Sequence, residues 1–82
     1  MRHSVHVSDD PDEFVQVALR VQALLGGTLG ECLHGLDQSY WDLTVDGAVI
    51  TIHREHYSGV MLICKDEPGA VALLERYRTV SR

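Results

Sequence analysis

The sequence lacks the motifs that identify most enzymes directly. It has no glycine-rich nucleotide loop, no complete set of metal ligands and no recognisable catalytic signature. It also has no apolar run approaching the roughly 20 residues that a membrane helix needs. Arg2 and His3 are followed by Ser8, Asp9 and Asp10 rather than by the apolar stretch of a secretory signal. We therefore expect a soluble, cytoplasmic protein that does not associate with membranes.

Basic residues are scarce in this chain. Lysine and arginine together number 7 against 12 aspartates and glutamates, which gives a formal net charge of -5. Because an acidic protein repels phosphate groups, we do not expect nucleic acid among its partners. The acids are densest in an acidic patch near the start of the chain, formed by Asp9, Asp10, Asp12 and Glu13. Such a patch favours encounter with a basic protein.

Cysteine is also sparse, with only Cys32 and Cys64. In the sheet predicted below, two strands separate them, so about 14 Å lies between them. A disulfide requires Cα atoms within about 7 Å, and we expect both thiols to be reduced and to behave as small buried hydrophobes. No neighbouring base or helix N-terminus is evident to lower either pKa, so neither is predicted to be a nucleophile.

The strongest structural signal is the pair Asp46-Gly47 between two alternating apolar segments, residues 40–45 and 48–53. Asp-Gly in this setting is typical of a two-residue hairpin turn. The resulting register places apolar residues opposite one another along one face of the ribbon. The predicted pairs on that face are Val45 with Ala48, Leu43 with Ile50 and Trp41 with Ile52.

A helix is predicted to begin at Asp10, with Pro11 in its first turn and Glu13 placed for a reciprocal contact with the cap. Gly26 and Gly27 end it. Apolar residues recur at helical spacing between these signals and form one buried stripe. The residues of this stripe are Phe14, Val17, Ala18, Val21, Leu24 and Leu25.

Additional strands are predicted at residues 3–7, 28–33 and 59–64, with a loop over residues 34–39 and a polar turn over residues 54–58. Asp66, Glu67 and Pro68 open a closing helix. The residues that this closing helix presents to the core are predicted to be Val71, Leu74, Tyr77 and Val80.

The element order is therefore β-α-β-β-β-β-α over a single domain, residues 1–82. Consecutive strands joined by short links usually lie side by side. We expect an α+β fold in which an antiparallel β-meander of four to five strands packs both helices on one face.

Five histidines include two His-x-x-His spacings, of which His53 and His56 flank a predicted turn. Residues three apart on a continuous strand point to opposite faces, so only a bend would let such a pair share a metal ion. His53 and His56 are weak metal candidates, and a histidine-based metal-binding or pH-responsive protein remains an alternative function. We expect no cofactor.

The second face of the hairpin carries polar and aromatic side chains. The register places Tyr40 opposite His53, Asp42 opposite Thr51 and Thr44 opposite Val49. Strand 59–64 is apolar on both faces although two helices cover only one side of the sheet, so this second face needs a shield. The predicted binding surface consists of Tyr40, Asp42, Thr44, Thr51, His53, Met61 and Ile63, with Val60 and Leu62 in place of the last two if the register shifts.

Three functions fit this surface. The leading one is a small non-enzymatic interaction protein, such as an adaptor, an inhibitor or an immunity-type protein, which binds a protein partner or a second copy of itself as a homodimer. The metal-binding or pH-responsive protein is the second. The third is a small enzyme in which Tyr40, His53 and Asp42 act as acid, base and orienting group, although an open sheet face excludes little water.

Overall fold

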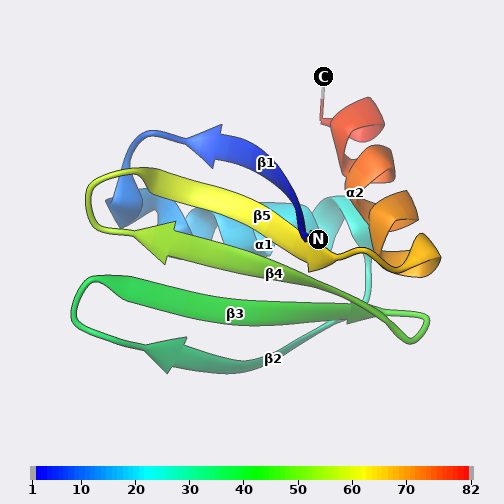
Figure 1. Ribbon diagram of the computed structural model, residues 1–82, viewed down its shortest axis with the longest axis horizontal. Helices are drawn as coiled ribbons and strands as arrows, with labels where there is room; N and C mark the ends of the chain where they lie inside the picture. The colour runs from blue at the N-terminus through cyan, green and yellow to red at the C-terminus, as the bar shows by residue number, and fades with distance from the viewer. Residues whose placement is uncertain (1, 82) are drawn as a thin grey trace.

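A computed structural model describes residues 2–81, which form five strands, two α-helices and one short 3-10 helix. Figure 1 shows these elements along the chain. Their bounds are β1 Arg2–Ser8, η1 Pro11–Glu13, α1 Phe14–Leu25, β2 Thr28–His34, β3 Gln38–Val45, β4 Ala48–Glu55, β5 Gly59–Lys65 and α2 Pro68–Val80. The observed order is the predicted one, and the α+β class is confirmed.

All five strands belong to one antiparallel sheet with the order β1-β5-β4-β3-β2 (Figure 1). Strands β2 to β5 form the expected meander. β1 lies at the opposite edge from β2 and pairs with β5, so that Val5 is opposite Leu62. The element order did not specify this position. Because α1 lies between β1 and β2 in the chain, their connection does not determine which strand β1 pairs with.

The β3–β4 hairpin has the predicted register over its whole length. Asp46 and Gly47 have φ angles of 50° and 83°, as a type I′ turn requires. The pairs Leu43 with Ile50 and Tyr40 with His53 therefore fall on opposite faces of the ribbon.

The β2–β3 connection is shorter than predicted. Residues 34–39 were expected to form a loop, but β2 continues to His34 and β3 already begins at Gln38. His34 pairs with Ser39 across the two strands, and the Gly35 N–H donates to the Gln38 carbonyl at 2.6 Å. Turn residues such as Gly35 correctly predicted a turn between the two strands, but they did not predict how short it is.

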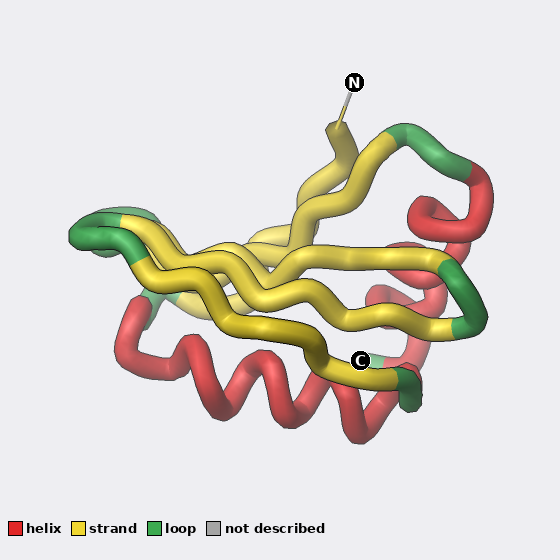
Figure 2. Tube along the Cα trace, turned by 90° about the horizontal axis from the view of Figure 1, so that it is seen from below, coloured by secondary structure: helices red, strands yellow, loops and turns green. Residues whose placement is uncertain are grey.

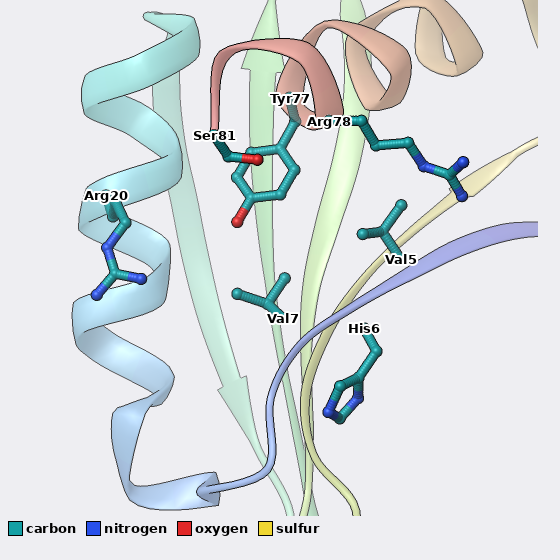
Figure 3. Close-up of a pocket in the computed structure, with 7 residues that line it drawn as sticks. All are labelled: Val5, His6, Val7, Arg20, Tyr77, Arg78 and Ser81. Atoms are coloured by element: carbon teal, nitrogen blue, oxygen red, sulfur yellow. The ribbon is translucent and has the colours of Figure 1, made fainter.

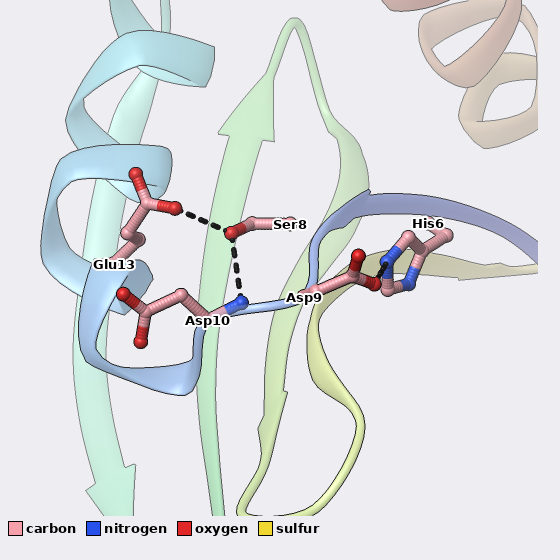
Figure 4. A network of polar contacts seen from close by, with 5 residues as sticks. All are labelled: His6, Ser8, Asp9, Asp10 and Glu13. Carbon is pink, nitrogen blue, oxygen red and sulfur yellow. Dashed lines mark hydrogen bonds and ion pairs between the residues drawn. The ribbon is translucent and has the colours of Figure 1, made fainter.

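The start of the first helix differs from the prediction in one contact. Asp10 is the N-cap, and its carboxylate accepts from the Asp12 N–H at 2.9 Å. The Glu13 carboxylate does not accept from the Asp10 N–H; the Ser8 hydroxyl donates to this carboxylate at 2.6 Å and accepts from the Asp10 N–H at 3.1 Å (Figure 4). Ser8 thus takes the place of the direct reciprocal contact.

Both helices pack on the same face of the sheet and contact each other (Figure 2). α1 buries the predicted stripe, in which Leu24 is half-buried. In α2, Val80 was predicted to face inward but is 43% exposed, because it lies at the helix end beyond the sheet that Leu74 and Tyr77 cover. Ala70 and Leu73 are buried instead.

The core lies between this helical layer and the covered face of the sheet. Its central strand residues include Leu43, Ile50, Ile52 and Leu62, all fully buried. Cys64 is also buried there, whereas Cys32 is half-buried on β2, and both are free thiols as predicted. Across residues 2–81, neither helix is long and apolar enough to cross a membrane.

Candidate functional site

The second face of the sheet points away from both helices, and no other element of residues 2–81 lies over it (Figure 2). The strand register brings the predicted binding residues together there. β5 has the unshifted register, so Met61 and Ile63 join this face while Val60 and Leu62 enter the core. We call this set the open-face surface: Tyr40, Asp42, Thr44, Thr51, His53, Met61 and Ile63.

The centre of the open-face surface is a stack of Tyr40 on His53. Their ring centroids are 4.5 Å apart and the ring planes differ by 8°. Met61 pairs with His53 from the other side. With a neighbour on each flanking strand, His53 is only 6% exposed although it lies on the face without helices.

His53 Nε2 is buried without a hydrogen-bond partner. The Glu55 carboxylate lies 3.9 Å away, beyond hydrogen-bond distance. Burial lowers the pKa of His53 below its usual 6.5; the Glu55 charge opposes this shift and Arg2 adds to it. The imidazole is therefore held neutral, with one polar atom unsatisfied, which costs about 1–3 kcal/mol.

Hydrogen bonds on this face do not join the three groups suggested for acid–base chemistry. The Tyr40 hydroxyl donates to the Gln38 side chain, and Thr51 Oγ1 donates to Asp42 Oδ1 at 2.6 Å. His53 stacks on the Tyr40 ring and makes no bond to its hydroxyl. The arrangement provides an aromatic platform rather than a proton-transfer chain.

A small cavity of about 180 Å³ adjoins this surface at the β4–β5 turn. The carboxylates of Asp37 and Glu55 line it together with His56 and Tyr57. Tyr57 is 90% exposed, and its ring meets His56 edge to face at 4.7 Å. Two carboxylates beside an exposed aromatic ring are suited to a guanidinium or ammonium group.

The suggested metal pair is not supported by a ligand set. His53 lies under Tyr40 on the open face, while His56 lies in the turn against Tyr57. Over the described range 2–81, no three histidine, cysteine, aspartate or glutamate side chains gather closely enough to hold a metal ion.

The acidic patch directly follows β1, at the end of the strand where Ser8 pairs with Val60 of β5. The Asp9 carboxylate accepts from His6 at 2.7 Å, and the Glu13 carboxylate accepts from the Ser8 hydroxyl (Figure 4). The Asp10 carboxylate caps the start of the helix. Asp12 is exposed. Half of this patch therefore has a local structural role in capping and in binding Ser8.

Another cavity, of about 430 Å³, lies between β1 and the two helices. Figure 3 shows Tyr77 between Arg20 of α1 and Arg78 of α2, with Val5 and Val7 of β1 beneath. Its two arginines contrast with the acidic charge of the chain. It shares no residue with the open-face surface.

The sequence reasoning missed one cluster at the β2 edge. Cys32 Sγ lies 3.3 Å from His34 Nε2, so a base does adjoin this thiol. His34 Nδ1 in turn lies 3.0 Å from Ser39 Oγ. The available signal was the Cys-x-His spacing: residues two apart share a face once residue 34 belongs to the strand and not to a loop.

The fold and the open face define a small α+β protein whose five-stranded antiparallel sheet is covered by helices on one side. The chain belongs to a family of proteins of unknown function, DUF3630, which matches residues 3–79. Neither a curated protein nor a solved structure matches it.

Proposed function

We propose that this protein is a small non-enzymatic interaction domain, of the adaptor, inhibitor or immunity type, that binds a basic protein through the open-face surface. The Tyr40–His53 stack carries the proposal. Rigid aromatic side chains held at the centre of a surface are typical binding anchors. Tyr40 is fixed by the imidazole below it and by its bond to Gln38, so little side-chain freedom is lost on binding.

Apolar side chains next to the stack support this role. Met61 is half-buried and Ile63 is 8% exposed, and both lie on the face that carries no helix. A partner that covers them removes apolar area from water, worth about 25 cal/mol per Å² before the costs of association.

Charge favours a basic partner. The chain has a net charge of -5, and Asp42 and Glu55 lie beside the stack. The cavity with Asp37, Glu55 and Tyr57 gives an incoming arginine or lysine two carboxylates and a ring face. Complementary charge of this kind raises the association rate, which then falls as salt screens it.

The test is capture from lysate of the source organism with the tagged wild type and three variants: Tyr40→Ala, the double variant Asp37→Asn with Glu55→Gln, and the control Arg78→Gln. The captured partner is identified by mass spectrometry, purified, and titrated against each form by calorimetry at low and high salt. We expect a partner with a basic surface whose affinity falls at least tenfold in Tyr40→Ala. The double variant should reduce the salt dependence, and Arg78→Gln, on the far side, should bind as the wild type does.

A partner that binds Tyr40→Ala as tightly as wild type, or one with an acidic surface, contradicts the proposal. So does recovery of the protein alone. Sedimentation velocity then distinguishes the two remaining cases. A dimer dispersed by Tyr40→Ala identifies a second copy as the occupant of this face, whereas a monomer leaves the face without a protein partner.

A further inference from the structure

Cys32, His34 and Ser39 form a chain of hydrogen-bonding groups where β2 meets β3. Cys32 Sγ and His34 Nε2 are 3.3 Å apart, and His34 Nδ1 and Ser39 Oγ are 3.0 Å apart. Arg54 on β4 extends the chain, because its Nε donates to the same Ser39 oxygen at 3.2 Å. β2 is an edge strand of the sheet (Figure 1).

The supporting groups hold the imidazole in place. Ser39 is fully buried, so its hydroxyl is fixed within the sheet. The Phe14 ring of α1 meets the His34 ring edge to face at 6.4 Å. Cys32 itself is half-buried and His34 is exposed, so small molecules in solvent reach the pair.

The arrangement is compatible with the tautomer of His34 that carries its proton on Nδ1. A hydroxyl oxygen has two lone pairs. When Ser39 Oγ accepts from both Arg54 Nε and His34 Nδ1, the lone pair of His34 Nε2 points toward the Cys32 sulfur. A base in this position takes the proton of the thiol as the thiolate forms.

We propose that Cys32 is a nucleophilic thiol, activated by His34, and a site of covalent modification by small electrophiles. With an alkyl halide, the Cys32 proton passes to His34 Nε2 and the sulfur forms a bond to carbon. The carbon–halogen bond breaks and halide leaves, and His34 then releases its proton to water. Nucleophile, base and orienting hydroxyl are the three parts of a thiol site of this kind.

The pKa of the thiol makes the base necessary. Burial raises the pKa of Cys32 above its usual 9.0, so ionisation without help leaves little thiolate at neutral pH. Of the neighbouring elements, β4 contributes the charged Arg54, whereas α1 and β3 contribute the uncharged Phe14, Ser39 and Trp41. Reactivity at neutral pH therefore depends on proton transfer to His34.

The test measures alkylation by iodoacetamide, resolved by mass spectrometry of the Cys32 and Cys64 peptides, at about pH 7 and about pH 9.5. Wild type is compared with His34→Gln and with the control His56→Gln, an exposed histidine of the β4–β5 turn. At the lower pH, His34→Gln should slow Cys32 labelling at least about tenfold, as removal of a general base does. At the higher pH the two rates should converge, because hydroxide then removes the thiol proton without the imidazole. His56→Gln should match wild type throughout.

Equal rates in wild type and His34→Gln at neutral pH overturn the proposal. A loss of the same size at both pH values also overturns it, because it shows a change in access and not in proton transfer. Labelling of the buried Cys64 reports unfolding of a variant. In that event the test uses the Cys32 labelling rates of wild type alone. A rate at pH 7 that is more than about a tenth of the rate at about pH 9.5 supports His34 as the base, and a rate of about a hundredth contradicts it.

Discussion

At the residue scale, His53 and Tyr40 show how far a side chain's role depends on its neighbours. The hairpin register alone places them opposite each other on the open face. The burial of His53 comes from Met61 on β5 as well, a strand whose register the sequence left open. β5 has apolar residues on both of its faces, so two registers satisfied the hydrophobic pattern equally.

A pH dependence of stability follows from His53. Its pKa is lowered in the folded state, so the unfolded chain binds more protons between that pKa and the ordinary 6.5. The stabilisation is present above about pH 6.5 and is lost as pH falls toward the folded-state pKa. Wild type should therefore lose more stability than His53→Gln between about pH 7.5 and about pH 5.5, as urea unfolding measures.

Comparing wild type with His53→Gln removes the contribution of the other titratable groups to the pH dependence of stability. His3 and His6 pair with Asp66 and Asp9, and these contacts are the same in both. An equal or smaller loss in wild type shows that His53 is not held neutral by its surroundings.

At the element scale, local chemistry determined the hairpin and the helix boundaries. Asp46-Gly47 gave the turn, and Asp10 and Pro11 gave the start of the first helix. The errors occurred where a local signal allowed two outcomes. The loop expected over residues 34–39 became a tight turn because His34 pairs with Ser39, and Glu13 turned to Ser8 because β1 ends beside the cap.

The hairpin turn makes a prediction about Gly47. Its φ is 83° and a Cβ added there meets no atom within 4 Å, so the cost of a side chain is conformational alone. Gly47→Val should destabilise the fold by about 1–2 kcal/mol in urea unfolding. Gly47→Asn should recover part of this, because asparagine tolerates a left-handed conformation.

Gly30→Ala is the matched control. Gly30 lacks a positive φ, and its added Cβ would lie 3.7 Å from the Asp42 carbonyl oxygen, an ordinary contact. Its stability should change by no more than about 0.5 kcal/mol. A Gly47→Val variant as stable as wild type refutes the type I′ turn.

At the scale of the whole molecule, one buried core joins both helices to β3, β4 and β5, and partly buried side chains of β1 and β2 pack against it. Leu62 of β5 is fully buried in it and pairs with Val5 on one side and Ile52 on the other. Because β5 lies between β1 and β4, a loss of side-chain packing at Leu62 affects the sheet and the helical layer together.

Leu62→Ala tests this arrangement. It should lower the free energy of unfolding by about 2–5 kcal/mol, the usual range for a large-to-small change in a core. Val49→Ala, on the open face and 39% exposed, should cost much less. Comparable losses in the two variants contradict the placement of the core on the helical side.

By itself, the sequence determined the α+β class, the order of the elements, the hairpin register and which residues of β3 and β4 share a face. These depend on turn chemistry, helix caps and hydrophobic period, all of which act within a few residues. Tertiary structure alone decided that β1 joins β5 and that Met61 flanks His53. It also decided that Cys32, His34 and Ser39 meet. Each of these depends on contacts between strands, whose pairing is set by burial of the whole sheet and not by local sequence.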